Sequence, residues 1–431
     1  MTTPNGAIVF DATYGSDTQA SGLGPATALY GSGATTDGTA VVTGITTTGV
    51  TAGDLLWVQT SSGRQFSVIA SVDSGTQVTG DDTLAAGLGQ TWAIGGKRAT
   101  WDNIDSRNLF SSDGFGLTIT TETDQSLTSE LDISVKCLVA GAGAIRTVDQ
   151  SADAANFGET TEENIYVSNL KFTNSNASST SNSRGYRRNG DLFARNCIFG
   201  DATNQLYHGM EHINGRTNFF LDNCVIQHCI GSGYSPSHGI SQANFINCVF
   251  HSNGQYGASL NSDTVNFHNC VFANNTGSGI YYPLSNNGSA RVNGCIFYKN
   301  GGSGIQGRFD GPLTVIDSVF YENTSYGFNA AVTPDKSYVF GNFQDSATTH
   351  NNFNIGSDVT TLTADIFTDG ASDDYSLNST AGGGAVLRAA SFSFASTQTR
   401  PFRWLDAATS SSGGGGSSYT NVASAKFTRL E

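Results

Sequence analysis

The chain has 431 residues, of which 52 are glycine, 7 are cysteine and only 13% are charged. That length suffices for one large domain and a small additional module. The formal net charge of −15 argues against a nucleic-acid partner, which needs a basic face. The odd cysteine count, with no CxxC pair, argues against a disulfide framework and against a zinc site.

Residues 1–33 are rich in glycine, alanine and threonine, and we expect them to form an N-terminal arm. The segment Met1–Phe10 lacks a basic region and a long apolar run, and no other segment has the apolar length that spans a membrane. The Ser/Thr/Asn/Gly-rich composition is common in extracellular and virion β-proteins. We therefore expect a virion protein, with a secreted protein as the alternative.

Residues 34–100 contain short β-type runs separated by Gly, Ser and Asp turns. These runs predict a small barrel-like β module ahead of the main domain. They are Val41–Thr43, Asp54–Gln59, Gln65–Val72 and Thr76–Thr79.

Between residues 169 and 320, one sequence pattern returns roughly every two dozen residues. It consists of a polar residue, a cysteine, an aliphatic residue and usually a phenylalanine. A fixed period of this size indicates stacked supersecondary units. The five clearest copies are centred on Cys197, Cys224, Cys248, Cys270 and Cys295, and the other two cysteines are Cys137 and Cys229.

Each repeat predicts one coil of a solenoid. The cysteine and the residue two positions later share a strand face, because strand side chains alternate with period two. An apolar residue three positions before the cysteine breaks this alternation, so a tight bend containing the asparagine must lie between them. Stacked coils would place the cysteines in an internal column beside a phenylalanine column. They would also form one asparagine ladder from Asn169, Asn196, Asn223, Asn247 and Asn269, and a second from Asn253, Asn275, Asn300 and Asn323.

The repeats, among them Tyr166–Phe172 and Asn244–Phe250, resemble the right-handed parallel β-helix proteins of the pectate-lyase-like superfamily. Ala364–Asp369 and Asp373–Leu377 resemble the segment that closes many such helices. The resemblance implies an all-β fold in which residues 101–390 form a β-helix with an end cap. It does not imply an activity, because the superfamily includes lyases, hydrolases, adhesins and virion spikes.

The densest polar cluster lies between two coils and suggests a glycan-binding patch. Arginine offers planar donor forks, and tyrosine offers a stacking surface. The alternative is an ordinary solvated turn region. His208 and His212 have the spacing of a helical metal pair, but their context is β and lacks a third ligand, so we expect neither a metal nor a cofactor. The cluster consists of Arg184, Tyr186, Arg187, Arg188, His208, Glu211, His212, Arg216 and His238.

Catalytic machinery is harder to find in the sequence. A glycoside hydrolase needs two carboxylates facing one groove at about 5–10 Å, and a pectate-type lyase needs a calcium-binding carboxylate group with an Arg or Lys base. The outward positions next to the cysteine carry no such array, being Lys171, Ile198, Val225, Val249, Val271, Ile296 and Val319. The remaining carboxylate candidates, Asp191, Glu211, Asp222, Asp263, Asp310 and Asp317, fall at different offsets in the repeat.

These observations favour a non-enzymatic virion surface protein of a bacteriophage, either a spike, a fibre or a capsid-decoration protein that contacts a cell-surface polysaccharide. The alternative is a polysaccharide-degrading β-helix enzyme, either a lyase or a glycoside hydrolase. The resemblance to phage spikes and the need to protect solenoid ends predict a homotrimer.

Residues 391–418 are expected to be an extension that ends in a flexible Gly/Ser linker. Residues 419–431 regain apolar character and predict a docking peptide for another virion protein or a neighbouring subunit. Its anchors are Tyr419, Val422, Phe427 and Leu430. A disordered tail is the alternative.

Overall fold

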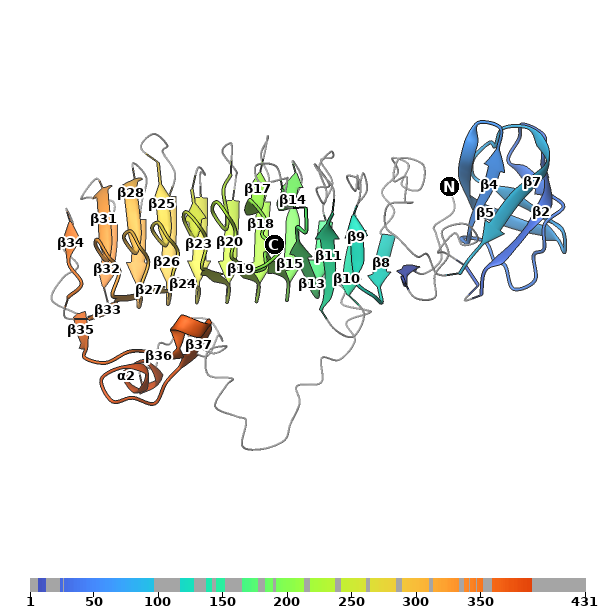
Figure 1. Ribbon diagram of the computed structural model, residues 1–431. Coiled ribbons are helices and arrows are strands. Elements are labelled where there is room, and N and C mark those ends of the chain that lie inside the picture. The colour runs from blue at the N-terminus through green and yellow to red at the C-terminus, as the bar shows by residue number, and fades with distance from the viewer. Residues whose placement is uncertain are drawn as a thin grey trace.

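Strands stacked in parallel dominate the computed structural model, and a separate barrel lies near the N-terminus (Figure 1). The structure describes residues 7–12, 24–25, 27–96, 117–127, 137–141, 145–151, 165–176, 183–188, 191–212, 218–236, 242–260, 264–283, 289–309, 313–332, 337–340, 342–345, 347–351 and 359–389. No helix in these ranges is long and apolar enough to cross a membrane.

The first sheet has 11 parallel strands in the described residues and runs the length of the solenoid. In spatial order its strands are β1 (Ala7–Phe10), β8 (Leu117–Thr121), β10 (Cys137–Gly141), β12 (Ile165–Ser168), β15 (Leu192–Arg195), β18 (Asn218–Asp222), β20 (Gln242–Ile246), β23 (Thr264–His268), β26 (Ser289–Asn293), β29 (Leu313–Ile316) and β32 (Ser337–Phe340).

The second sheet also has 11 parallel strands in the described residues, and each of them except the last, β35, follows the first-sheet strand of its coil. They are β9 (Gln125–Leu127), β11 (Arg146–Gln150), β13 (Leu170–Thr173), β16 (Ile198–Phe199), β19 (Val225–Gln227), β21 (Val249–His251), β24 (Val271–Ala273), β27 (Ile296–Tyr298), β30 (Val319–Tyr321), β33 (Asn342–Asp345) and β35 (Val359–Leu362).

A third sheet completes the coils from the one that contains β12 and β13 onward in the described residues. Isolated bridges through Tyr234 join its two parts, from Met210 to Tyr234 and from Tyr234 to Ala258. The first part is β14 (Arg184–Arg188) with β17 (His208–His212), and the second is β22 (Ala258–Ser259), β25 (Ile280–Tyr282), β28 (Ile305–Phe309), β31 (Phe328–Val332) and β34 (His350–Asn351).

The predicted N-terminal module is a closed barrel. Its strands β2 to β7 are Leu29–Thr36, Val41–Thr43, Leu55–Thr60, Gly63–Ser74, Gln77–Gly80 and Gly87–Ile94. The segment before it is not simply an arm, because Ala7–Phe10 pairs in parallel with Leu117–Thr121. The apolar run in β1 therefore supplies the first strand of the solenoid, and the barrel follows it in the chain.

The bend between the first and second sheets confirms the role of the asparagines. Asn169, Asn196, Asn223, Asn247 and Asn269 all have φ of 53–54°, the left-handed region that asparagine tolerates better than most residues. Their side chains form a ladder with one interruption. Asn223 donates to Asn196 Oδ1 at 2.7 Å and Asn269 donates to Asn247 Oδ1 at 2.6 Å, but Asn247 donates to Asp222 Oδ1 at 3.2 Å.

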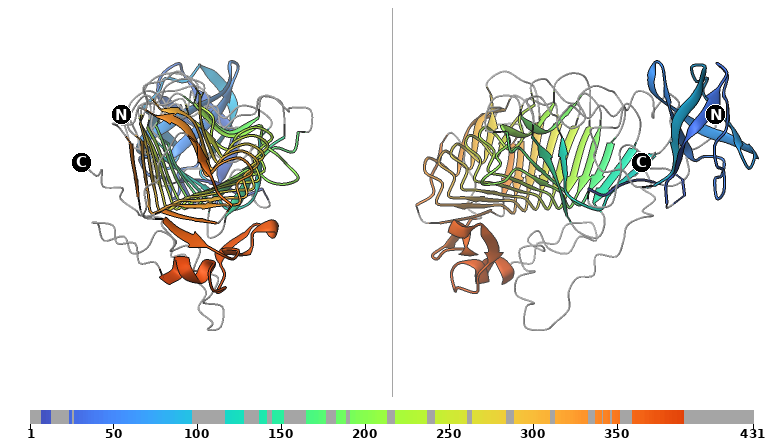
Figure 2. Two further views of the ribbon diagram at one scale, coloured as in Figure 1. Left: turned by 90° about the vertical axis from the view of Figure 1, so that its left-hand side faces the viewer. Right: turned by 45° about the vertical axis from the view of Figure 1, so that its right-hand side comes forward.

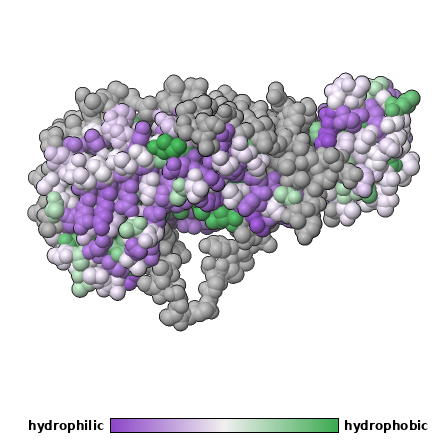
Figure 3. All heavy atoms as spheres, in the orientation of Figure 1, coloured by the Kyte–Doolittle hydropathy of each residue, from purple (hydrophilic) through white to green (hydrophobic). Residues whose placement is uncertain are grey.

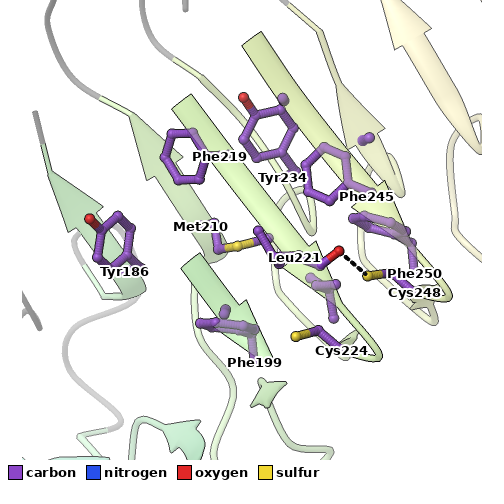
Figure 4. Packing of buried hydrophobic residues seen from close by; sticks show 14 of the residues in the cluster. Tyr186, Phe199, Met210, Phe219, Leu221, Cys224, Tyr234, Phe245, Cys248 and Phe250 are labelled. Atoms are coloured by element: carbon purple, nitrogen blue, oxygen red, sulfur yellow. Dashed lines mark hydrogen bonds between the residues drawn. The ribbon is translucent and has the colours of Figure 1, made fainter. Parts of the chain in front are cut away.

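The interior contains the predicted columns. The five repeat cysteines are free thiols and at most 1% exposed. Their Sγ–H groups donate to backbone carbonyls, as Cys248 does to Leu221 at 3.7 Å (Figure 4). Phe250, Phe272, Phe297 and Phe320 stack in sequence with centroid separations of 4.8, 5.0 and 5.0 Å.

The second asparagine ladder is fully internal. Asn253, Asn275 and Asn300 are 0–1% exposed, and each side-chain amide donates to the Oδ1 of the next member at 2.8–2.9 Å. Each amide also donates to a backbone carbonyl, such as Phe272 O for Asn300 at 2.9 Å. The ladder therefore satisfies polar groups inside the turn that leads from the second sheet to the third.

The C-terminal segment does not close the end of the solenoid as the sequence predicted. Residues 363–389, here called the clip, contain β36 (Phe367–Asp369), the 3-10 helix η3 (Gly370–Ser372), β37 (Asp374–Leu377) and α2 (Gly384–Ala389). Figure 2 shows this segment outside the stacked coils. It lies on the outer face of the second sheet, where it forms an apolar cluster with Val249, Val271, Ile296, Tyr298, Val319 and Tyr321. Four of the outward positions next to the repeat cysteines, which the sequence showed to lack carboxylates, are thus packed against the clip. They are Val249, Val271, Ile296 and Val319.

Candidate functional site

The predicted glycan patch lies on the third sheet, where β14 and β17 pair in register. Arg184 pairs with His208 and Arg187 with Glu211. Arg184 Nε donates to Glu211 Oε2 at 2.5 Å, and both residues are only 8% exposed. The Arg184 guanidinium also lies 5.3 Å from the centre of the Tyr207 ring. The structure therefore brings the two charges together as a buried ion pair.

His208 is buried beside this pair, with 9% of its surface exposed. Its Nδ1 accepts a hydrogen bond from Ser232 N at 3.1 Å. Burial lowers the pKa of His208, and the positive Arg184 nearby lowers it further. The imidazole is therefore neutral near pH 7, and it is held against the backbone of the next coil.

Tyr186 corrects one prediction for this patch. It is 1% exposed and makes an edge-to-face contact with Phe219 inside the solenoid (Figure 4). The reason is strand alternation, which points Tyr186 toward the core together with its register partner Met210. Its ring is not available for stacking against a ligand. For Arg187, Arg188 and His212 only the strand position is described, and Arg216 and His238 lie outside the described residues.

The carboxylate candidates within the described residues each have a structural role. Asp191 accepts hydrogen bonds from the backbone and the side chain of Asn218. Asp222 lies 3.5 Å from Arg195 Nε and also accepts from Asn247. Asp317 occupies a left-handed bend position, with φ of 49°. Asp263 and Asp310 lie outside the described residues.

The outer face of the first sheet carries a feature that the sequence analysis did not identify. Tyr166, Phe193 and Phe220 are register partners on three successive strands, and we call them the aromatic strip. The first two rings stack at 4.6 Å, and the second pair is 6.5 Å apart. All three side chains are half-buried. Each stands four positions before the thiol position of its repeat, so the sequence contained the signal.

Polar side chains extend the same face around the aromatic strip. Arg195, whose side chain is 57% exposed, follows Phe193 by two residues. Farther along the face, Asn266 donates to Asn244 Oδ1 at 2.9 Å, and Arg291 is exposed at the next register position. Figure 3 shows one face of the molecule, where most of the coloured surface is hydrophilic or neutral.

A second polar group lies where the clip meets the solenoid. His228 and His251 come from successive coils, and Asp373 comes from the clip at a left-handed position, with φ of 61°. His251 Nδ1 lies 3.1 Å from Asp373 Oδ1, and His228 Nε2 lies 3.3 Å from Asp373 Oδ2. These three residues lie outside the polar cluster that the sequence indicated, and the sequence predicted no metal site.

The charge states in this group follow from its contacts. The hydrogen bond with His251 is the main cause that holds the pKa of Asp373 below its usual range, although burial opposes it. Burial lowers the pKa of His228. Asp373 is therefore ionised and His228 neutral near pH 7. No signal in the sequence placed residue 373 beside residues 228 and 251.

The family comparison agrees with this architecture. Residues 159–343 and 237–373 match the family model described as the right handed beta helix region. The protein is a right-handed parallel β-helix protein. Its predicted fold class is thereby confirmed. A comparison with curated proteins found no significant match.

Several solved structures are similar to this chain at low identity. The pectate lyase Pel9A is 16% identical with a TM-score of 0.31, covering 58% of this chain and 65% of that chain. The Agl-KA catalytic domain is 11% identical with a TM-score of 0.36, covering 80% and 78%. The tailspike protein gp49 from Pseudomonas phage LKA1 is 12% identical with a TM-score of 0.25, covering 79% and 66%. We draw no functional conclusion from likenesses at this level.

Proposed function

We propose that this β-helix protein is a non-enzymatic surface protein that binds a cell-surface glycan along the outer face of its first sheet. The aromatic strip is the observation that carries this proposal. The three rings lie in a row on successive strands, and each is half-buried. Part of the flat apolar surface of each ring is therefore open to solvent. Exposed apolar surface rimmed by polar groups commonly marks a binding site.

The chemistry of the strip suits a sugar chain. The apolar faces of sugar rings pack against flat aromatic rings, and the sugar hydroxyl groups need hydrogen-bond partners at the sides. Arg195 and Asp222 lie beside the strip and supply a donor fork and an acceptor. Arg195 would also pair with the carboxylate of an acidic sugar.

The carboxylate contacts support binding without catalysis. Asp191, Asp222 and Glu211 are engaged by Asn218, Arg195 and Arg184 respectively. A general acid or a nucleophile must instead direct a free oxygen at the scissile bond. We therefore assign Asp191 and Glu211 to contacts between coils and Asp222 to the polar rim of the aromatic strip.

The binding test compares ring-removal variants on two faces. Phe193→Ser and Phe220→Ser should weaken binding to a panel of immobilised neutral and acidic bacterial polysaccharides by about tenfold each, because a lost stacking contact of about 1.4 kcal/mol gives that factor. Tyr281→Ser is the matched control, since Tyr281 stacks on Tyr256 at 4.3 Å near a different sheet. Equal binding by all variants would contradict the proposal.

The setting that we propose is the surface of a bacteriophage virion, where the protein would act as a homotrimer. The low charged fraction and the Ser/Thr/Asn/Gly-rich composition support this setting, and solenoid ends need protection that subunit contacts supply. Light scattering at micromolar concentration should give about three times the 45.1 kDa chain mass. A species of single-chain mass would count against the trimer.

Tyr419, Val422, Phe427 and Leu430 lie outside the described residues, and their docking role is part of the same proposal. Deleting residues 413–431 should leave the melting temperature unchanged and abolish incorporation into particles. Normal incorporation of the shortened chain into particles would rule out the docking role.

A polysaccharide-degrading enzyme is the second candidate. The buried cluster of Arg184, His208 and Glu211 favours it, because costly buried charges gather at active sites. Incubation with the same polysaccharides should then release reducing ends, and Glu211→Gln should abolish the release. Product formation that survives Glu211→Gln would place catalysis elsewhere.

A further inference from the structure

The second bend of each coil forms a polar column beneath the clip. His228, Ser252, Asn274, Lys299 and Glu322 stand at equivalent places in successive coils, and all have φ of 45–53°. Several of them hold the clip. Asn274 Nδ2 donates to Gly370 O at 2.7 Å, and Lys299 Nζ lies 3.0 Å from Asp365 Oδ2. The His228 end of this column has different chemistry, because two imidazoles and one carboxylate converge there.

The orientation of His251 is fixed from behind. Gln227 Nε2 donates to Gly200 O at 3.3 Å, which turns Gln227 Oε1 toward His251. That oxygen lies 2.8 Å from His251 Nε2, so Nε2 carries the proton and donates. The other ring nitrogen, Nδ1, faces Asp373 Oδ1 at 3.1 Å and also lies 3.2 Å from Ser252 Oγ. A positive charge between Nδ1 and the carboxylate, supplied by a proton on Nδ1 or by a metal ion, satisfies both atoms.

The three donor atoms lie close enough together to share one ion. His228 Nε2, His251 Nδ1 and an Asp373 carboxylate oxygen all lie within 4.8 Å of one another. Tetrahedral zinc with bonds of about 2.0–2.1 Å has ligand atoms about 3.3–3.4 Å apart. The distance of 3.3 Å between His228 Nε2 and Asp373 Oδ2 agrees with this spacing.

The surroundings of the ligands resemble those of metal sites in general. Metal-binding histidines donate their second N–H to a carbonyl or carboxylate oxygen, as His251 does to Gln227. The ligating carboxylate is itself held, because Tyr375 OH donates to Asp373 Oδ1 at 2.9 Å and Ser252 Oγ donates at 3.3 Å. Oδ2 is thereby directed at His228.

From this geometry we propose that His228, His251 and Asp373 bind a divalent transition-metal cation of the zinc class. Imidazole and carboxylate donors suit zinc and its neighbours in the first row. The two histidines belong to the solenoid and the aspartate to the clip, so the ion would fasten the clip to the coils. The site is independent of the proposed glycan function.

The test uses the full chain, first stripped with EDTA and then freed of chelator. Titration calorimetry with zinc chloride should give one tight equivalent, and cobalt chloride should give the visible absorption of four-coordinate Co²⁺. Zinc should raise the melting temperature, and EDTA should reverse the rise. A wild-type protein that binds no zinc in calorimetry overturns the proposal.

Two variants localise the ion. Asp373→Asn keeps a residue that tolerates positive φ, and His228→Gln removes a ligand from the solenoid side. Each should weaken zinc binding by about 100-fold or more and abolish both the cobalt absorption and the melting shift. His268→Gln, on the first sheet, is the control and should bind like the wild type. If both ligand variants bind zinc as tightly as the wild type, the ion lies at other histidines and the proposal is wrong.

Discussion

Replacing Asn300 with alanine should destabilise the solenoid far more than the loss of a surface amide. Asn300 is 0% exposed, and its Nδ2 donates to Phe272 O at 2.9 Å and to Asn323 Oδ1 at 2.8 Å. Its Oδ1 accepts from the backbone N of Asn275 at 3.3 Å and from the side-chain amide of Asn275 at 2.9 Å. The alanine variant removes all four bonds, three of them to the preceding coil and one to the following coil.

The size of the destabilisation depends on which of the buried groups keep a hydrogen-bond partner. Asn323 Oδ1 still accepts from the backbone N of residue 300, and Asn275 Nδ2 still donates to Phe250 O. The backbone N–H of Asn275 loses its acceptor. A buried N–H without an acceptor costs about 2 kcal/mol. The loss of one hydrogen bond at each of the other partner groups adds about 1 kcal/mol in total. The total of about 3 kcal/mol corresponds to a fall in melting temperature of about 5 °C for a domain of this size.

The assay is thermal unfolding followed by far-ultraviolet circular dichroism, which reports on the strands of the solenoid. Asn266→Ala is the matched control, because it also breaks an asparagine–asparagine bond, at 2.9 Å, but on the half-buried outer face. It should cost only about 0.5 kcal/mol. If the Asn300 variant melts within about a degree of the Asn266 variant, the internal ladder does not stabilise the coils as argued.

Three further outcomes test the packing and the charges. Cys248→Asp buries an unpaired carboxylate in the thiol column and should lower the melting temperature severely, whereas unchanged melting would show that the column is not internal. Gly279→Ala places a Cβ 2.8 Å from a carbonyl oxygen and an aromatic carbon of the next coil, and should cost about 2–3 kcal/mol in urea denaturation; no loss would contradict that contact. The hydrogen bond from Lys171 lowers the pKa of Asp201 to about 2, so its stabilisation is present above the unfolded pKa of about 3.9 and disappears as the pH falls from about 4 to about 2. Asp201→Asn should flatten the pH dependence of melting in that window, and a curve parallel to the wild type would refute the assignment.

The repeat made the solenoid predictable because its spacing carries geometric information. A cysteine, a phenylalanine two positions later and an asparagine one position earlier define a strand, its inward face and its bend. The left-handed φ of Asn223 and the stacked pair of Phe272 and Phe297 follow directly from that register. The columns are therefore consequences of periodicity and strand alternation.

The sites were less predictable for two physical reasons. The first reason is strand alternation, which decides whether a side chain points into the core or toward solvent. It directs Tyr186 into the core and leaves the rings of the aromatic strip half-buried on the outer face. The second reason is that the clip folds back across the coils, so Asp373 meets His228 and His251 from a distant part of the chain. Periodicity carries no information about such a contact. The first strand, Ala7–Phe10, was missed for a similar reason, because its partner follows the barrel in the chain.

The most direct test of the proposed function is size-exclusion chromatography with light scattering. The intact protein is first incubated with a polysaccharide from the panel that bound it in the immobilised form. A non-enzymatic glycan-binding protein predicts that protein and polysaccharide elute together and that the polysaccharide keeps its starting mass. A fall in polysaccharide mass with time, or separate elution of the two, would contradict it.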